Sequence, residues 1–206
     1  MSPGVDAGHH LMTVPDLESA ARTVVMLLDG VPDSALAAPT PCGDTSVAGL
    51  LDHLMGLSEG LRAAAAKEPD HGAPTPSADN LDPQWRTVLP TRLDALVAAW
   101  RDPAAGEGLT SAGGVQMPAA DIAVVTLDEL VLHGWDLARA TGQVYDPDPG
   151  DVTAILGFLE AFGSAEGTPG LFGPAVSVPA DAPPFDRALG LSGRDPGWRS
   201  PAPVDG

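Results

Sequence analysis

Two side chains that could do chemistry, a carboxylate and an imidazole, lie four residues apart at Glu129 and His133, in the most apolar segment of the chain. On an α-helix, side chains at this spacing project from the same side. Burying both groups among apolar neighbours is unfavourable unless each finds a partner. A divalent cation would satisfy them, and so would a hydrogen bond between them. The pair alone therefore leaves a metal site and a buried ion pair open.

A second histidine, His53, stands at the edge of the apolar face of the predicted helix 45–67, about 40° from Leu57 on a helical wheel. If this helix faces the one that carries Glu129 and His133, the three groups converge. Two imidazoles and a carboxylate suit zinc, nickel, iron or manganese, and three protein ligands leave a position open for water or substrate. Asp136, one turn beyond His133, is a candidate to orient that imidazole from behind.

Three glycines, Gly49, Gly56 and Gly60, follow one another along the side of the same predicted helix. Each is unfavourable in a helix interior by roughly 0.8–1 kcal/mol relative to alanine. We therefore expect them to leave space beside His53. Such a space would admit a neighbouring helix, a metal with its waters, or a substrate.

The other polar candidates have ordinary structural explanations. Cys42, the single cysteine, is a conceivable nucleophile but is expected to be a small packed residue in the turn before helix 45–67. Arg194 could pair with a substrate carboxylate, although a surface or structural salt bridge is the expected role. His9, His10 and His71 fall in a tail and a loop, so we do not expect them to bind a metal.

Composition limits the classes of partner. The chain has 206 residues, with 28 acidic against 10 basic ones and a net charge of −18. Nucleic acids and anionic membranes are therefore excluded as expected partners. One cysteine permits no intrachain disulfide, and no signal-peptide pattern or long uncharged apolar run is present. We expect a cytoplasmic protein, monomeric or homodimeric.

The apolar periodicity predicts an all-α protein. Helices are expected at about 13–29, 45–67, 83–100, 118–141 and, shorter, 148–162. The helix at 118–141 is apolar almost all round and should be the most buried. The Gly-rich loop 102–117 could hold short extended pieces, and 175–178 resembles a strand. We predict a four-helix bundle over 13–162, with a Gly/Pro-rich extension at 163–206 that packs on the bundle and has a flexible end.

Four segments carry a resemblance to a known family. They are Thr-Pro-Cys-Gly-Asp at 40–44, Leu-Asp-His-Leu-Met-Gly at 51–56, Glu-Leu-Val-Leu-His-Gly-Trp-Asp-Leu-Ala at 129–138 and Leu-Ser-Gly-Arg-Asp-Pro-Gly-Trp at 191–198. In these segments the chain resembles the DinB/YfiT-like metalloenzyme superfamily. Within it, the chain is similar to the actinobacterial branch that includes mycothiol-dependent maleylpyruvate isomerase.

The resemblance implies a DinB-like four-helix bundle that holds a divalent metal, most often zinc or nickel. By position in the motifs, the implied ligands are His53, Glu129 and His133. It also implies a low-molecular-weight thiol such as mycothiol as cosubstrate, held by the metal as a thiolate that attacks a small electrophile in isomerisation or S-transfer. Two alternatives remain: a binding protein for a metal or small ligand without catalysis, and a structural module in which Glu129 and His133 only pair.

Overall fold

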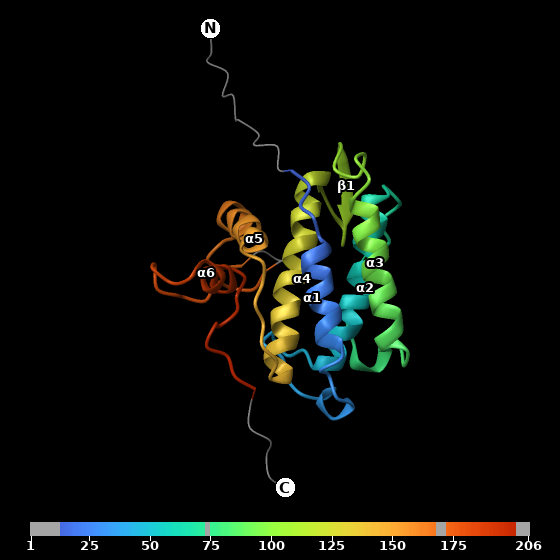
Figure 1. Cartoon of the computed structure of the whole chain (residues 1–206). Coiled ribbons are helices and arrows are strands. Elements are labelled where there is room, and N and C mark those ends of the chain that lie inside the picture. Colours follow the sequence, from blue (N-terminus) through green and yellow to red (C-terminus); the bar gives the residue numbers. More distant parts are fainter. Residues whose placement is uncertain (1–12, 73–74, 168–171, 201–206) are drawn as a thin grey trace.

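Four long helices lie side by side and form a bundle (Figure 1). The computed structural model describes residues 13–72, 75–167 and 172–200. The bundle helices are α1 (Glu18–Leu28), α2 (Val47–Ala65), α3 (Trp85–Trp100) and α4 (Ala119–Thr141). Helix α4 packs against α1 and α2, and α3 packs against the same two helices from the other side. The predicted four-helix arrangement is therefore present.

Local signals in the sequence explain several helix ends. The Ser46 side chain accepts a hydrogen bond from the Gly49 amide at 3.2 Å and so caps α2. Helix α4 ends at Gly142, whose φ of 70° lies in the left-handed region that glycine tolerates. The predicted start of α1 near residue 13 was wrong. The Asp16 carboxylate accepts the Glu18 amide, and the helix begins at Glu18, after a segment without regular secondary structure.

The apolar core is formed by leucines and valines from all four helices, and α4 is buried along most of its length. Thr126 is one of the few polar residues inside, and its hydroxyl donates to the Ile122 carbonyl at 2.8 Å. Because α4 is surrounded by other elements, polar side chains on it face protein groups or cavities rather than bulk water. This placement leaves His133 buried and Glu129 half-buried.

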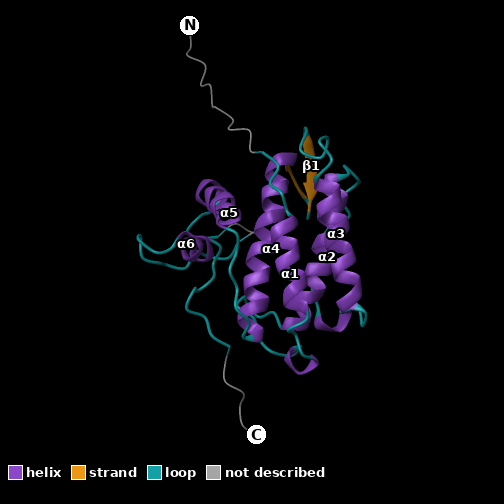
Figure 2. Ribbon diagram, viewed as in Figure 1, coloured by secondary structure: helices purple, strands orange, loops and turns teal. Residues whose placement is uncertain are grey.

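The loop before α4 contains the extended pieces that its sequence allows. Strand β1 (Leu109–Ala112) pairs with β2 (Val115–Pro118) in an antiparallel hairpin that places Ser111 opposite Gln116. Gly113 and Gly114, with φ of 59° and 83°, make the tight turn between the strands. The Thr110 hydroxyl bonds the Ala64 carbonyl at 2.6 Å and fixes the hairpin to the end of α2. The fold is thus mostly helical with one small sheet (Figure 2).

The C-terminal part of the chain forms a layer on the α4 side of the bundle (Figure 1). It contains α5 (Pro149–Phe162) and α6 (Pro184–Leu191), which pack against each other, while α5 also packs against α4. Two short 3-10 turns, Asp33–Ala35 and Ala78–Asn80, lie in the loops of the bundle. The strand expected at 175–178 was wrong, because this stretch is irregular and its Val176 amide bonds the Gly190 carbonyl. The flexible end expected after 200 lies outside the described residues.

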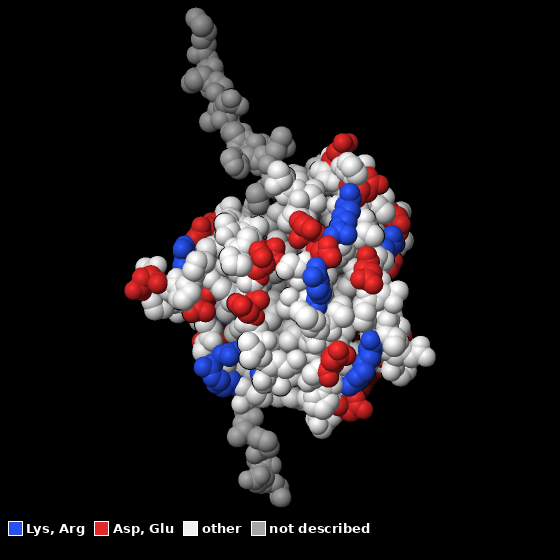
Figure 3. Space-filling view, in the orientation of Figure 1, with Lys and Arg blue, Asp and Glu red and all other residues white. Residues whose placement is uncertain are grey.

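The surface agrees with the acidic composition. Acidic side chains are spread over the face shown in Figure 3, and the few basic ones lie beside them. Arg62, for example, pairs with Glu59 at 2.9 Å and Glu68 at 2.8 Å. Within the described ranges, no helix has the length and apolar character needed to cross a membrane.

Candidate metal centre

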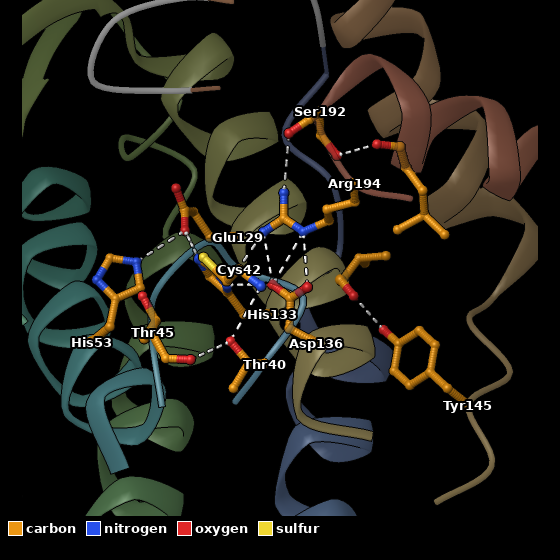
Figure 4. Close-up of polar contacts among 12 residues, drawn as sticks. Thr40, Cys42, Thr45, His53, Glu129, His133, Asp136, Tyr145, Ser192 and Arg194 are labelled. Atoms are coloured by element: carbon orange, nitrogen blue, oxygen red, sulfur yellow. Dashed lines mark hydrogen bonds and ion pairs between the residues drawn. The ribbon is translucent and has the colours of Figure 1, made fainter. Parts of the chain in front are cut away.

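The three side chains predicted as metal ligands come together between α2 and α4 (Figure 4). Glu129 Oε2 lies 2.9 Å from His133 Nε2 and 3.6 Å from His53 Nε2. The two imidazole rings meet edge to face, with centroids 4.8 Å apart. One oxygen and two nitrogens therefore point at a common region.

The ring orientation of His133 fits a metal ligand. Its Nδ1 lies 3.0 Å from Asp136 Oδ2, so this nitrogen carries a proton and donates to the carboxylate. On a neutral ring, Nε2 then presents a lone pair toward Glu129 Oε2. That oxygen is itself buried and has no hydrogen-bond partner in the described part of the chain. Acceptors converging with no donor between them are what a divalent cation requires, so the residues present fit one.

Asp136 holds His133 from the position that the helical spacing predicted, and it is fully buried. It is held in turn by Arg194, whose Nη2 donates to Asp136 Oδ2 at 2.8 Å and whose Nε donates to Oδ1 at 3.0 Å. Burial alone would raise the pKa of Asp136, but the charge of Arg194 and the bond from His133 lower it. The salt bridge expected for Arg194 is therefore a buried one, which lies behind His133.

Neighbouring charged and polar groups shift the pKa values of His133 and Glu129 in opposite directions. Burial opposes the charge on His133, yet the neighbouring Asp136, Cys42 and Glu129 raise its pKa well above the usual value. Burial likewise opposes the charge on Glu129, and its contacts with His133 and His53 outweigh this and lower the pKa of the carboxyl. Without a cation, a proton on His133 would thus take over the neutralisation of these carboxylates.

A cavity of about 460 Å³ opens onto this cluster. His53, with 30% of its side chain exposed, and Glu129, with 22%, face it more openly than His133, with 8%. Its lining residues come from the turn before α2, from α2 and α4, and from the C-terminal layer: Pro41, Cys42, Gly43, His53, Asp128, Glu129, Leu132, His133, Phe172, Gly173, Pro174, Ser192, Gly193 and Arg194. The converging atoms of the three candidate ligands are therefore reachable by a small molecule.

The glycines expected to make this space do not line it. Gly56 and Gly60 border a separate cavity of about 300 Å³ beside Arg92, and a Cβ on Gly49 would meet Thr45 at 3.3 Å. A helical wheel gives the direction of each glycine but not the element it meets, which is why the prediction failed. The glycines that do line the site cavity include Gly43 and Gly193, which lie in loops and have positive φ.

Two residues of the cavity were not identified as site residues from the sequence. Cys42 lies half-buried in the turn before α2, as expected, but it also contacts His133. Asp128 is 2% exposed and lines the cavity beside Glu129. Burial, followed by the nearby charge of Glu129, raises the pKa of Asp128 to about 8. An acidic residue inside the most apolar helix was the signal in the sequence that could have pointed to Asp128.

Comparison with known proteins identifies the family. The sequence model described as the mycothiol maleylpyruvate isomerase N-terminal domain matches residues 17–138, which include all three candidate ligands. The chain belongs to this family. The DinB-like superfamily and its mycothiol-related branch, expected from four short segments, are thereby confirmed.

Two relatives and two solved structures resemble the chain over most of its length. The two relatives, both described as uncharacterized proteins, come from two strains of Mycobacterium tuberculosis. Each is 30% identical over 192 residues, covering 86% of this chain and 94% of the relative. The solved mycothiol-dependent maleylpyruvate isomerase has the same fold, with a TM-score of 0.54 at 14% identity, and a variant of it gives 0.55 at 15%. Each likeness covers 69% of this chain and 66% of the isomerase.

Proposed function

We propose that the protein holds one divalent cation at His53, Glu129 and His133. The observation that carries this proposal is the buried Glu129 Oε2, which faces two imidazole nitrogens and has no hydrogen-bond partner among the described residues. Zinc and nickel suit this set of ligands, although the donor types alone do not select one metal. Asp136 and Arg194 would keep the His133 lone pair aimed at the cation.

We further propose that the centre serves a reaction of a low-molecular-weight thiol with a small electrophile, by S-transfer or isomerisation. A bound cation would supply the positive charge that keeps the thiol sulfur deprotonated and in place. The chain contributes the open cavity beside His53 and Glu129, and Arg194 in its wall keeps a positive charge near incoming anions. The mycothiol dependence stated for the solved isomerase supports the choice of a thiol.

A second candidate is a protein that binds the metal or a small ligand and catalyses nothing. It is favoured by one observation: about a third of the solved isomerase has no counterpart in this chain, because the likeness covers 66% of it. The two candidates share the metal centre and differ only in turnover, so one set of experiments separates them.

Metal analysis of protein purified without a nickel column tests the shared part. We expect about one divalent ion per chain, and loss of that ion in His53→Ala and His133→Ala. His71→Ala is the matched control, because this histidine is exposed in the loop after α2 and outside the cavity. Failure of the wild-type protein to take up metal after reconstitution would refute the centre. If metal binds, turnover of a thiol with a panel of electrophiles would favour the enzyme. Stoichiometric metal binding without turnover would favour the binding protein.

A further inference from the structure

Several residues that line the cavity beside the candidate metal centre are apolar. They include Leu132 of α4 and, from the C-terminal layer, Phe172 and Pro174. The Phe172 ring packs edge to face on Phe158, with centroids 6.4 Å apart, and Phe158 is 1% exposed. Phe172 is thus anchored to a buried residue of the layer. We call Leu132, Phe172 and Pro174 the apolar lining.

Most of the apolar lining lies outside the shared domain. Phe172 and Pro174 follow residues 17–138, the part of the chain that the family model matches, whereas the three candidate ligands fall inside it. Many apolar residues with a few polar groups are typical of cavities that bind small molecules. What the apolar lining selects is therefore not fixed by membership of the family.

The cavity offers little positive charge to a substrate carboxylate. Apart from imidazoles, Arg194 is the only basic side chain among the described residues that line it. Its Nε and Nη2 donate to Asp136 at 2.8 to 3.1 Å, and its Nη1 reaches the Ser192 carbonyl at 3.5 Å. The lining also contains the carboxyl groups of Asp128 and Glu129, which add no positive charge. The charge of Arg194 is therefore balanced inside the protein by Asp136.

The same balance holds for the loaded centre of the proposed function. Glu129 and a bound thiolate would offset the two positive charges of a divalent ion. Arg194 can attract that thiolate, but a second anion would find no partner. Burying an unpaired carboxylate is unfavourable, whereas an uncharged apolar group gains free energy by leaving water. The residues around the centre thus favour a second substrate without charge.

We propose that the apolar lining binds the electrophile, and that this substrate is uncharged and carries an apolar group that contacts Phe172. The inference rests on the proposed function, since it assumes a thiolate at the cation. It adds the class of electrophile that the site accepts. It also assigns selection of that class to a residue of the C-terminal layer.

The test measures binding of unreactive probes to cobalt-loaded protein saturated with 2-mercaptoethanol. A sulfur–cobalt absorption band in the near ultraviolet shows that the thiol fills the metal position, so a probe carboxylate cannot take it. The probes are 3-phenylpropanamide, its charged counterpart 3-phenylpropanoate, and butanamide, which lacks the ring. Titration calorimetry gives each dissociation constant. We expect 3-phenylpropanamide to bind at least about tenfold more tightly than 3-phenylpropanoate, because the carboxylate finds no partner.

Two variants test whether Phe172 contacts the ring of the probe. Phe172→Ala should weaken binding of 3-phenylpropanamide by about 2- to 12-fold, the effect of one aromatic pair, and should leave butanamide nearly unchanged. Phe162→Ala is the matched control. Phe162 packs on the same Phe158, with centroids 4.7 Å apart, but does not line the cavity, so the affinity should stay within about twofold of the wild type.

The possible failures are distinguishable. If 2-mercaptoethanol produces no band, the thiol chemistry of the proposed function fails, and this inference with it. If the band appears but 3-phenylpropanamide does not bind, or 3-phenylpropanoate binds as tightly, or Phe172→Ala has no effect, this inference alone is overturned. Should Phe172→Ala not fold, nuclear Overhauser contacts between the probe's ring and Phe172 in zinc-loaded, thiol-saturated wild type decide: their presence supports the role and their absence overturns it.

Discussion

Arg194 and Asp136 are 58 residues apart in the sequence and form a buried ion pair at the back of the candidate metal centre, closest at 2.8 Å. The same carboxylate bonds His133 Nδ1 at 3.0 Å. One side chain of α4, Asp136, therefore joins the C-terminal layer to the candidate metal ligand His133 (Figure 4). The geometry of the centre depends on a segment that the four helices alone do not contain.

Replacing Arg194 by alanine should weaken both the fold and the metal centre. Asp136 is fully buried, so loss of the Arg194 guanidinium leaves its carboxylate as an uncompensated charge. Such a loss typically destabilises the fold by about 3–5 kcal/mol. Cation affinity should fall about 10- to 100-fold, because the group that orients His133 is no longer fixed. Denaturant unfolding and competition with a metal indicator measure the two effects.

Arg22→Ala is the control, because it breaks only an exposed pair with Glu18. It should change stability by at most about 1 kcal/mol, and equal effects of Arg194→Ala and Arg22→Ala would contradict this account.

Removal of the cation should make stability depend on pH in a defined direction. The raised pKa of His133 stabilises the cation-free fold below about pH 6.5, and this contribution is lost as the pH rises through the folded-state pKa. Cation binding needs a neutral ring, so it strengthens over the same rise. We expect the difference in melting temperature between zinc-loaded and chelator-treated protein to widen from pH 6 to pH 8. A constant difference, or a difference that persists in His133→Gln, would count against the assignment.

The bundle was predictable because its helices carry strong local signals. Helix α4 starts within one residue of its predicted position and ends at Gly142 as expected. Helix α6 could not be found in this way. It has eight residues, begins at a proline, and is held by packing against α5, which no local pattern reveals.

The clustering of the three candidate ligands was predictable for the same reason, but the residues that surround them were not. Helical spacing places Glu129 and His133 on one side of α4, and His53 was the only other histidine in a predicted helix. Cys42 and Arg194 reach the cavity from loops, whose paths follow from tertiary contacts rather than from periodicity. Their presence in the site therefore needed the folded structure.

Arg139 of α4 holds the end of the described chain without touching the candidate metal ligands. Arg139 Nη2 donates to the Pro196 and Trp198 carbonyls at 3.2 and 3.1 Å. Arg139→Met keeps the aliphatic stem and removes these donors. Hydrogen exchange of a peptide covering 195–200 should speed up about tenfold, while cation affinity stays within about twofold, because Asp136 keeps Arg194. Arg199→Met, which loses contacts only within its own segment, is the control, and a large loss of affinity in Arg139→Met would contradict the separation of the two roles.

Gly134, one residue after His133, leaves room for the ring of Tyr145. A Cβ there would lie 3.0 Å from the Tyr145 Cε2 and hydroxyl, and that hydroxyl donates to the Val131 carbonyl at 2.7 Å. Alanine gains about 1 kcal/mol over glycine inside a helix. At this position, however, overpacking costs about 1–3 kcal/mol and the Tyr145 hydrogen bond is strained as well.

Gly134→Ala should therefore lower the melting temperature, although the same change in an open helix raises it. Gly157 in α5 is the matched control, because nothing lies within 4 Å of the position its Cβ would take. We expect Gly157→Ala to raise the melting temperature by about 2–4 °C and Gly134→Ala to lower it by a similar amount. Equal increases in the two variants would show that Tyr145 can move aside freely. The glycine would then have no role in placing this ring against α4.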